Sequence, residues 1–373
     1  MRRVFELDAY ADRAFRSLAE GLEPRDHAFA MQLAYGTVQR VRTLDYGIET
    51  LGRRPVRKLD PPVRAALRMG AYQLAFMDVS VHAAVNESVE LVRTAGLERA
   101  VAFTNAVMRR LAEGLRGLVG SLPEGTPPEA AIKHSYPDWV TETWWRELGP
   151  DDAGALMRAQ NEPAERVVRE SKLRPGASWP QSRGSQLAGA AVGAQPGERV
   201  LDLCAAPGGK ATQLAEVAAE VVAVEKHPGR ARELVENAER MGATNMTVVH
   251  ADALELSPEH TGFDRALVDA PCSGLGVLNS RPDLRWRATP LPELQVALLR
   301  AAIDRVKPGG SVTYAVCTIH KAENEDVVDS LGAELDDLGA EYPEFRHPGR
   351  PEFLLTLPHV HGTSGFFVAR MRT

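Results

Sequence analysis

The chain has 373 residues, 44% of them hydrophobic, which is enough for about two domains with apolar cores. Its 44 Lys and Arg against 50 Asp and Glu give a net charge of −6, and this balance does not by itself indicate nucleic-acid binding. No run approaches the roughly 18 apolar residues that cross a membrane, and the charged start is unlike a signal peptide, so we expect a soluble cytoplasmic protein without a membrane partner.

The chain contains three cysteines, and their spacing argues against two common uses of this residue. Three cysteines cannot all pair in disulfides, and none stands in the C-x-x-C spacing of structural zinc sites. His359 and His361 are close in sequence, but they have no acidic or cysteine partner at ligand spacing. We therefore expect a reduced protein that holds no metal.

Residues 1–120 are predicted to form an all-helical domain. Apolar residues recur at alternating steps of four and three from Ala30 to Leu51, which predicts one long amphipathic helix. Pro61 opens another helix, because proline is tolerated in a first turn, and a further helix is predicted through Val81–Val92. The domain carries 18 Lys and Arg against 14 Asp and Glu, so it is mildly basic. A plain packing domain and a binding domain both fit this pattern.

Residues 121–180 are predicted to join two domains. Proline-rich breaks near both ends enclose a helical patch that contains Trp139, Trp144 and Trp145. These tryptophans can stack on bases, but their spacing favours packing of the helix against a neighbour.

Residues 181–373 alternate strands and helices, the pattern of a doubly wound, Rossmann-like α/β sheet. Five strands are predicted, at Arg199–Leu203, Val221–Glu225, Met246–His250, Arg265–Asp269 and Ser311–Val316. The run 366–371 predicts a late strand that can pair antiparallel. Each of the three cysteines follows the end of a predicted strand, the edge where open α/β sheets bind their ligands.

The loop after the first predicted strand is the first candidate site. It consists of Cys204, Ala205, Ala206, Pro207, Gly208, Gly209 and Lys210. Its glycines let the backbone approach a ligand, and the helix that follows offers free N–H donors. The spacing matches neither the NAD nor the ATP fingerprint, so we expect another nucleotide-like cofactor. Glu225, which ends the second strand, either binds ribose hydroxyls or is a solvated strand-end residue.

Four segments of the first domain resemble a known RNA-binding module. They read Tyr-Gly-Thr-Val-Gln-Arg (35–40), Arg-Met-Gly-Ala-Tyr-Gln-Leu (68–74), His-Ala-Ala-Val-Asn-Glu-Ser-Val-Glu-Leu (82–91) and Phe-Thr-Asn-Ala-Val-Met-Arg-Arg-Leu (103–111). This wording is similar to NusB-like domains, in the version fused to ribosomal RNA methyltransferases of the RsmB (Sun/Fmu) family. The resemblance implies an all-helical module that binds RNA.

The loops of the second domain resemble the same family. They read Asp-Leu-Cys-Ala-Ala-Pro-Gly-Gly-Lys, then Asp-Ala-Pro-Cys-Ser-Gly-Leu-Gly-Val-Leu, then Tyr-Ala-Val-Cys-Thr-Ile with Glu-Asn-Glu-Asp-Val-Val after it. These motifs are similar to those of RNA cytosine-5 methyltransferases that use S-adenosylmethionine. The resemblance implies S-adenosylmethionine as cofactor and RNA as substrate, with small-subunit ribosomal RNA favoured. We expect the protein to act as a monomer.

The chemistry of such an enzyme requires a thiol. Carbon 5 of cytosine is a poor nucleophile until a thiolate adds at carbon 6. The resemblance implies that Cys317 is this nucleophile and that Cys272 assists product release. Asp269 is expected to bind the cytosine edge or supply a proton, and Asp252 to meet the adenine end of the cofactor. With both thiol roles filled, Cys204 is interpreted as a small loop residue.

The segment after the Pro-Cys loop is predicted to contact RNA. Guanidinium groups bind phosphates and a flat ring can stack on an exposed base. The residues concerned are Arg281, Arg285, Trp286 and Arg287. The alternative is a solvated loop with a packed tryptophan. Lys210, in the first loop, donates to the cofactor or to Asp269, or is solvated.

One interval is far shorter than in relatives that carry a small RNA-positioning subdomain there, namely Asn161 to Pro180. Either the chain lacks that subdomain or the sequence is incomplete at this point. Two other functions are considered. Intact Cys272, Cys317 and Asp269 argue against a non-catalytic RNA-binding or ribosome-assembly factor with a degenerate methyltransferase fold. The NusB-like domain argues against a methyltransferase of DNA or small molecules.

Overall fold

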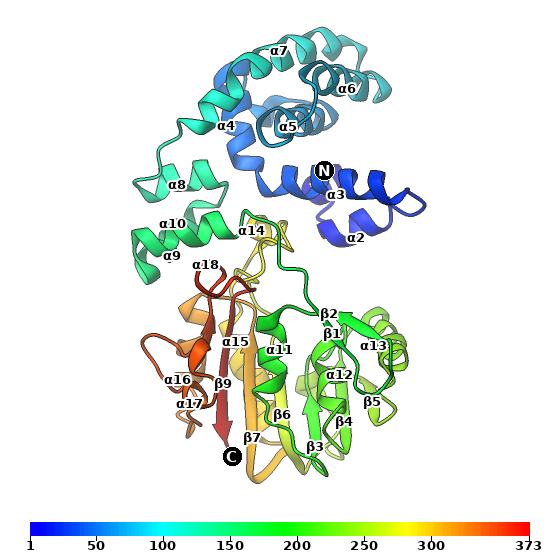
Figure 1. Ribbon diagram of the computed structural model, residues 1–373, viewed down its shortest axis with the longest axis vertical. Coiled ribbons are helices and arrows are strands. Elements are labelled where there is room, and N and C mark those ends of the chain that lie inside the picture. The colour runs from blue at the N-terminus through cyan, green and yellow to red at the C-terminus, as the bar shows by residue number, and fades with distance from the viewer. The chain divides into compact units, whose positions relative to one another are not determined.

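The computed structural model describes residues 1–373, which form two compact units (Figure 1). The helical unit comprises Met1–Glu162 together with Leu278–Arg287, and the sheet unit comprises Pro163–Val277 together with Ala288–Thr373. None of the helices combines the length and the apolar character that crossing a membrane requires.

The helical unit is an all-α bundle. Its helices are α1 (Arg2–Glu6), α2 (Ala11–Arg16), α3 (Pro24–Gln39), α4 (Val41–Gly52), α5 (Pro61–Phe76), α6 (Val81–Thr94), α7 (Glu98–Gly120), α8 (Pro127–His134), α9 (Asp138–Leu148), α10 (Pro150–Ala159) and α14 (Leu284–Arg287), with a 3-10 turn η1 (Val56–Lys58). Leu44, Leu67, Met108 and Leu111 are buried at the centre of the α4–α7 core, where apolar burial stabilises the packing.

The long helix predicted from Ala30 to Leu51 is two helices, α3 and α4. Arg40 separates them, with φ −100° and ψ 11°, outside the α-helical region. Both helices pack on α5, and α4 packs in addition on α7. Periodicity alone does not reveal such a difference in partners.

The predicted connection 121–180 does not exist as one segment. Helices α8, α9 and α10 belong to the helical unit, where Trp144 is fully buried against Tyr136 with ring centroids 5.3 Å apart. Packing is therefore the role of Trp144. The remainder folds with the sheet unit as a hairpin of β1 (Val168–Glu170) and β2 (Ser178–Pro180).

The sheet unit contains a seven-stranded sheet with strand order β5-β4-β3-β6-β7-β9-β8. The strands are β3 (Arg199–Asp202), β4 (Glu220–Glu225), β5 (Met246–His250), β6 (Phe263–Asp269), β7 (Val306–Val316), β8 (Leu354–Thr356) and β9 (Phe366–Arg372). The first five are parallel, and β9 pairs antiparallel with β7 and β8. All five predicted central strands and the antiparallel late strand are confirmed, while β8 was not predicted.

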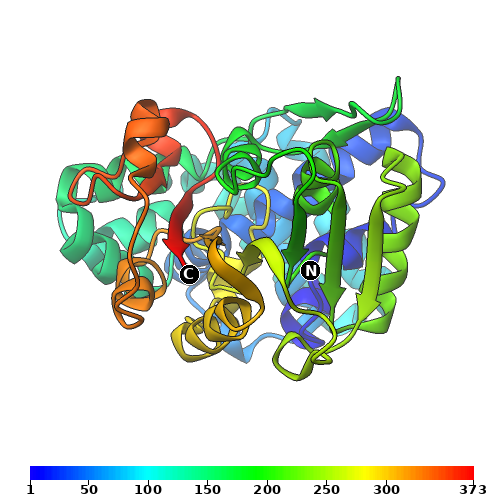
Figure 2. The ribbon, with the colours of Figure 1, turned by 90° about the horizontal axis from the view of Figure 1, so that it is seen from below.

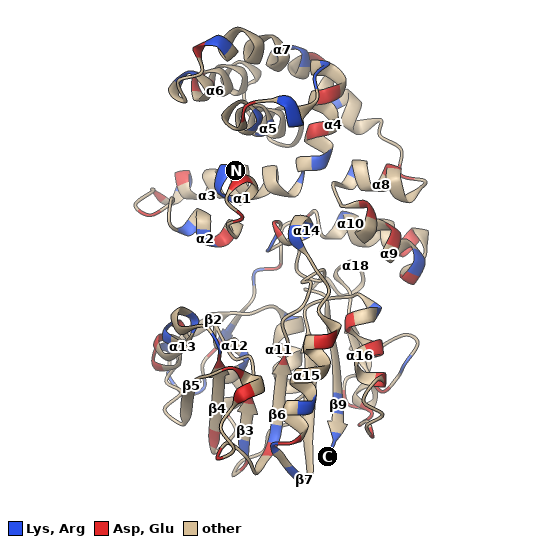
Figure 3. Ribbon diagram, turned by 180° about the vertical axis from the view of Figure 1, so that it is seen from behind, with Lys and Arg blue, Asp and Glu red and all other residues tan.

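Helices cover both faces of this sheet, which gives the doubly wound fold. Figures 1 and 3, seen from opposite sides, place α11 and α15 on opposite faces. The helices are α11 (Arg183–Ala190), α12 (Gly209–Ala215), α13 (Pro228–Met241), α15 (Pro292–Ile303), α16 (Glu325–Asp329), α17 (Leu338–Glu341) and α18 (Pro358–His361), with 3-10 turns η2 (Ala253–Glu255), η3 (Lys321–Glu323) and η4 (Pro343–Phe345).

The parallel strands lie side by side and end at one edge of the sheet (Figures 1 and 2). The loops after β3, β4, β6 and β7 therefore meet along this edge. These loops carry residues that the sequence selected, since Cys204 follows β3, Glu225 ends β4, Asp269 ends β6 and Cys317 directly follows β7.

Candidate active site

Asp202, at the end of β3, is the most unusual carboxyl group of the sheet edge. It is fully buried, its Oδ1 accepts the Cys204 backbone N–H at 3.3 Å, and its Oδ2 has no hydrogen-bond partner. Burial, and secondarily the charge of Asp269, raises the pKa of Asp202 to about 7. The sequence analysis missed this residue, although it stands in the Leu-Asp-Leu-Cys motif.

The loop after β3 is braced from α13. Arg230 donates to the carbonyl of Ala206 at 2.5 Å, and Asn237 donates to that of Pro207 at 2.9 Å. Gly208 has φ +114°, a conformation that favours glycine. A side chain at Gly209 would lie 2.8 Å from the indole nitrogen of Trp179. Both glycines are therefore required by the local backbone and packing.

Cys204, in the same loop, is set apart from the other two thiols. Burial, and after it the charges of Asp202 and Asp269, raises the pKa of its thiol, which therefore stays protonated. The interpretation of Cys204 as a small loop residue stays a prediction.

Glu225 and Asp252 follow β4 and β5 along the same edge. Glu225 is buried, its Oε1 accepts the His227 backbone N–H at 2.7 Å, and Arg230 lies 3.4 Å from its Oε2. Asp252 pairs with Lys226 at 2.6 Å and caps η2, and the hydrogen bond from Lys226 lowers the pKa of Asp252. Both carboxylates thus lie where the sequence placed them, already oriented by neighbours.

Lys210 and Asp269 form an ion pair between the first loop and the end of β6. The Lys210 Nζ lies 2.7 Å from the Asp269 Oδ2 and 4.9 Å from the centre of the Phe366 ring. The sequence left open whether Lys210 contacts the cofactor, Asp269 or solvent, and in the structure it pairs with Asp269. The pair fixes the carboxyl group at the point where the Pro-Cys loop begins.

Cys272 and Cys317 face each other across neighbouring strands. Their sulfur atoms are 3.4 Å apart, within hydrogen-bond distance, and neither is in a disulfide. The hydrogen bond to Cys317, then burial and the charges of Cys317 and Glu323, raises the pKa of Cys272 well above its usual value. Cys272 therefore keeps its proton at neutral pH, and either sulfur of the pair can donate to the other.

A buried network supports the thiols, and sequence reasoning missed its members. Glu323 is fully buried and accepts the Ser273 N–H at 3.0 Å, the Ser273 hydroxyl, the Leu291 N–H at 3.1 Å and the Gln295 amide at 3.0 Å. The Ser273 hydroxyl lies 2.9 Å from that of Thr318. A hydrogen bond thus connects Ser273 and Thr318, the residues that follow the two cysteines. Glu323 stands in the Glu-Asn-Glu-Asp-Val-Val motif, which could have signalled it.

The prediction that Arg285 contacts RNA is wrong. The residue lies on α14 of the helical unit (Figure 3), where its side chain is fully buried and stacks 4.1 Å from the Tyr136 ring. Its guanidinium donates to the carbonyls of Gln39 at 3.2 Å, Ser135 at 3.1 Å and Gln160 at 3.3 Å. These carbonyls stand at the C-terminal ends of α3, α8 and α10. Arg285 satisfies helix ends instead of phosphates.

The other residues predicted to contact RNA are Arg281, Trp286 and Arg287, and they differ in how exposed they are. The indole N–H of Trp286 donates to the carbonyl of Val38 at 2.7 Å, so the ring is held by the helical unit. Arg281 and Arg287 remain partly exposed, on the ring of Tyr10 at 5.5 Å and 4.0 Å. Contact of these two arginines with RNA stays a prediction.

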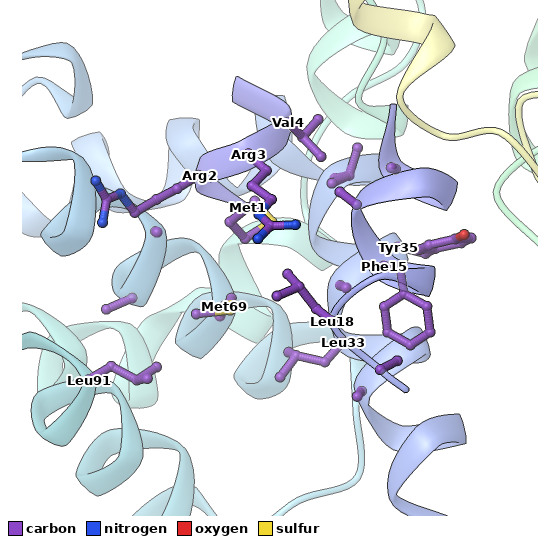
Figure 4. Close-up of a pocket in the computed structure, with 18 of the residues that line it drawn as sticks. Met1, Arg2, Arg3, Val4, Phe15, Leu18, Leu33, Tyr35, Met69 and Leu91 are labelled. Carbon is purple, nitrogen blue, oxygen red and sulfur yellow. The ribbon is translucent and has the colours of Figure 1, made fainter. Parts of the chain in front are cut away.

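A separate cavity of about 520 Å³ lies within the helical unit (Figure 4). Apolar residues of α2, α3 and α5 line it, among them Phe15, Leu33 and Met69, and the charged groups at its wall are Arg2, Arg3 and the N-terminus. It contains none of the predicted site residues. No cluster of three or more His, Cys, Asp or Glu side chains is arranged to hold a metal ion.

Comparison with known proteins places both units in families. A model of the 16S rRNA methyltransferase RsmB/F family matches residues 190–372, and a model of the NusB family matches residues 2–113. The ribosomal RNA small subunit methyltransferase B of Thermus thermophilus is 34% identical, over 93% of this chain and 89% of the relative. The chain belongs to the RsmB family.

Another relative is longer than this chain. The ribosomal RNA small subunit methyltransferase B of Salmonella paratyphi B is 29% identical, over 100% of this chain and 96% of the relative. That alignment spans 424 positions, 51 more than the 373 residues of this chain, so the relative carries additional residues. The crystal structure of PH0851 aligns with a TM-score of 0.78 and 25% identity, over 97% of this chain and 93% of that chain.

Proposed function

We propose that this RsmB-family methyltransferase transfers a methyl group from S-adenosylmethionine to carbon 5 of a cytosine in small-subunit ribosomal RNA. The observation that carries the proposal is the thiol pair Cys272 and Cys317, with sulfurs 3.4 Å apart, beside the Lys210–Asp269 ion pair at one sheet edge. The names of the relatives support the ribosomal substrate. Activation of a pyrimidine ring requires a thiolate, and this edge holds the two thiols from which one can form.

The sheet edge fits a cofactor that has a ribose and a cationic amino-acid group. Asp202 offers a buried carboxyl oxygen without a protein partner, and Glu225 a buried carboxylate at the neighbouring strand end. We propose that Glu225 binds the ribose hydroxyls, that Asp252 meets the adenine end, and that the 204–210 loop holds the methionine part. S-adenosylmethionine, when bound, supplies an electrophilic methyl group.

The residues of the second and third loops act on the base. Cys317 Sγ donates an electron pair to carbon 6, and the displaced π electrons make carbon 5 nucleophilic toward the methyl group. Asp269, held by Lys210, accepts a hydrogen bond from the amino group at the cytosine edge and orients the ring for attack. After carbon 5 loses its proton to solvent, the bond to sulfur breaks, Cys272 donates its own proton to the departing Cys317 thiolate, and solvent reprotonates Cys272.

The assignment of Cys317 as nucleophile rests on the family, and the closeness of the two sulfurs gives Cys272 a part beside it. A raised pKa of Cys272 means that this thiol keeps its proton at neutral pH. A protonated Cys272 at 3.4 Å is a hydrogen-bond donor that stabilises a thiolate on Cys317.

Labelled S-adenosylmethionine tests the function directly. The full chain is incubated with small-subunit ribosomal RNA, with DNA of matched length and with a nucleoside pool, and the labelled product is digested and identified. We expect 5-methylcytosine from the ribosomal RNA alone. Absence of transfer to every substrate would favour a non-catalytic assembly factor, and label on DNA or at another base position would reject the proposed substrate.

Glu225→Ala tests the cofactor site. Loss of hydrogen bonds from ribose hydroxyls to a charged acceptor should weaken S-adenosylmethionine binding by about 1–3 kcal/mol, measured by calorimetry. Glu233→Ala on the neighbouring helix α13 is the matched control, and its affinity should equal that of the unmodified protein. Unchanged affinity in a folded Glu225→Ala protein would reject the ribose role.

A further inference from the structure

The β1–β2 hairpin of the sheet unit has one buried residue, and it is an arginine. Arg169 stands in the middle of β1 between the exposed Val168 and Glu170, and it pairs with Trp179 of β2. A single hairpin of such short strands is not stable alone. The hairpin therefore depends on what Arg169 and its neighbours contact.

The Arg169 guanidinium lies along one face of α12, the helix that follows the candidate cofactor loop. It donates to the Gly209 carbonyl at 3.1 Å and to the Thr212 hydroxyl at 2.8 Å, and it forms an ion pair with Glu216. These three partners are spaced by three and four residues, the spacing of one helix face. Both side chains of the ion pair are more than nine-tenths buried.

Thr212 connects Arg169 to the turn of the loop. Its hydroxyl accepts from Arg169 and donates to the Gly208 carbonyl at 2.7 Å. The carbonyls of both loop glycines are thus bonded to one network, whose donor is the planar fork of Arg169. Lys210 is the next residue, and its Nζ lies 2.7 Å from the Asp269 Oδ2. Arg169 is therefore linked, through the backbone of the turn, to the carboxylate that ends β6.

The second strand of the hairpin and the residue after it strengthen the same contact. Gln181 is buried, accepts from the Arg169 Nε at 2.9 Å and donates to the Gln213 amide oxygen at 3.0 Å. A side chain at Gly209 would lie 2.8 Å from the indole nitrogen of Trp179. The hairpin thus packs directly on the first residue of α12, and all three nitrogens of Arg169 are used.

We propose that Arg169 is a positioning residue of the cofactor loop, which fixes the turn at Gly208 and Gly209 and, through Lys210, the carboxylate of Asp269. The inference rests on the proposed function, in which the 204–210 loop holds the methionine part of S-adenosylmethionine. Apolar residues in place of a buried ion pair are often neutral for stability, but they would offer the loop no hydrogen bonds. Arg169 acts through the loop and does not need to touch the cofactor.

Amide hydrogen exchange in the full chain, without RNA or cofactor, tests whether Arg169 fixes the loop. The useful reporters are the amides of Ala205 and Thr212, which donate to the carbonyls of Val224 at 3.0 Å and Gly208 at 2.9 Å. Lysine has three donors and no planar fork, so Arg169→Lys cannot reproduce these four bonds. We expect exchange in segment 204–212 to become about tenfold faster, with unchanged rates in β6 and β7.

Two results of this experiment would overturn the proposal. One is unchanged exchange in segment 204–212 of a folded Arg169→Lys protein. The other is exchange that rises equally throughout the sheet unit, since that is expected if Arg169 only stabilises the fold.

Affinity for S-adenosylmethionine shows whether the fixed turn serves the cofactor. In calorimetry, Arg169→Lys should bind S-adenosylmethionine about tenfold more weakly than the unmodified protein, because the loop must then be ordered on binding. Binding to small-subunit ribosomal RNA should change less than about twofold, because phosphate contacts supply most of that affinity. An equal loss of both affinities would reject a role specific to the cofactor loop.

Arg265 offers a matched control in the same unit. It donates to Glu198 at 2.7 Å and to the Val192 carbonyl at 3.0 Å, and it lies near the start of β6, whereas Asp269 ends that strand. Arg265→Lys should leave both the exchange of segment 204–212 and the affinity for S-adenosylmethionine unchanged. Equal effects of the two substitutions would overturn the proposal.

Thr212→Val keeps the proposal testable if Arg169→Lys does not fold. Valine has the shape of threonine and leaves the ion pair of Arg169 in place, but it lacks the hydroxyl that bonds Gly208. Exchange in segment 204–212 should again rise, and unchanged exchange would overturn the proposed connection. If the unmodified protein binds no S-adenosylmethionine, the proposed function fails, whereas exchange without cofactor still decides whether Arg169 fixes the loop.

Discussion

At the scale of single residues, the two thiols must have different fates when either is removed. Cys317→Ala should abolish methylation and form no covalent adduct, since no thiolate can add to carbon 6. Cys272→Ala should accumulate protein bound to RNA, because release lacks its proton donor. A denaturing gel with labelled RNA measures both. Trapping by Cys317→Ala, with none by Cys272→Ala, would reverse the two roles.

Asp202 provides a second prediction, because its burial makes stability depend on pH. Its folded pKa of about 7 lies above the unfolded value of 3.8, so its contribution to stability is complete below pH 3.8 and is lost as pH rises to about 7. In Asp202→Asn the side chain cannot ionise, so this pH-dependent loss of folding stability is absent. The stabilisation by Asp202→Asn should grow by about 3 kcal/mol between about pH 5 and about pH 8.

Denaturant unfolding of both proteins at the two pH values measures this difference, and other titrating groups cancel in the comparison. The same substitution should weaken S-adenosylmethionine binding, because it removes the charge at the cofactor side of the edge. A stabilisation that does not change with pH would show that Asp202 ionises normally in the folded protein.

At the scale of elements, α14 carries Arg285, which was predicted to contact RNA but instead holds the ends of other helices. Arg285 bonds carbonyls at the ends of α3, α8 and α10, and burial lowers its pKa to about 10, which leaves it charged at neutral pH. Removal of the guanidinium takes a buried donor from each of these carbonyls, and of the three only that of Gln160 has a second described side-chain donor, the Gln39 amide at 2.9 Å. Arg285→Ala should therefore destabilise the helical unit by about 3–5 kcal/mol, measured by chemical unfolding.

The neighbouring Arg287 is the matched control for this prediction. It is partly exposed and pairs with Asp8, whose side chain is 85% exposed, at 3.2 Å. Exposed pairs contribute little, so Arg287→Ala should cost less than about 1 kcal/mol. Equal destabilisation by the two substitutions would show that burial of the Arg285 guanidinium is not what holds the helix ends.

The elements also show what a sequence can and cannot predict. The central strands follow from β-branched apolar runs and the sheet edge from their order, so Asp269, Cys272 and Cys317 were found. The break at Arg40 and the burial of Arg285 were not, because both depend on which helix packs on which. Glu323 was missed for the same reason, since its partners lie 28 to 50 residues away. Local patterns predict elements, whereas long-range contacts decide side-chain roles.

At the scale of the whole molecule, the net charge of −6 conceals exposed arginines on the helical unit. Around η1, an exposed basic cluster lies between α4 and α5, and it consists of Arg53, Arg54, Arg57 and Lys58. Phosphate contacts release counterions, so affinity that depends on them falls steeply with salt. We predict that this cluster makes sequence-independent contacts with the phosphates of the RNA strand.

Neutralising the basic cluster tests this prediction in the full chain. With each of its four residues replaced by Gln, binding to small-subunit ribosomal RNA should weaken, and the slope of log affinity against log salt should become shallower by about 0.7 for each phosphate that the protein no longer neutralises. The control is the double variant Lys307→Gln and Arg372→Gln. Both residues lie at the end of the sheet that faces away from the candidate active site, and their replacement should leave the salt slope unchanged. Because the cluster captures the strand and does not position the base, methylation at saturating RNA should be unaffected. If the variant had the same salt slope as the unmodified protein, the basic cluster would not be the surface that binds phosphates.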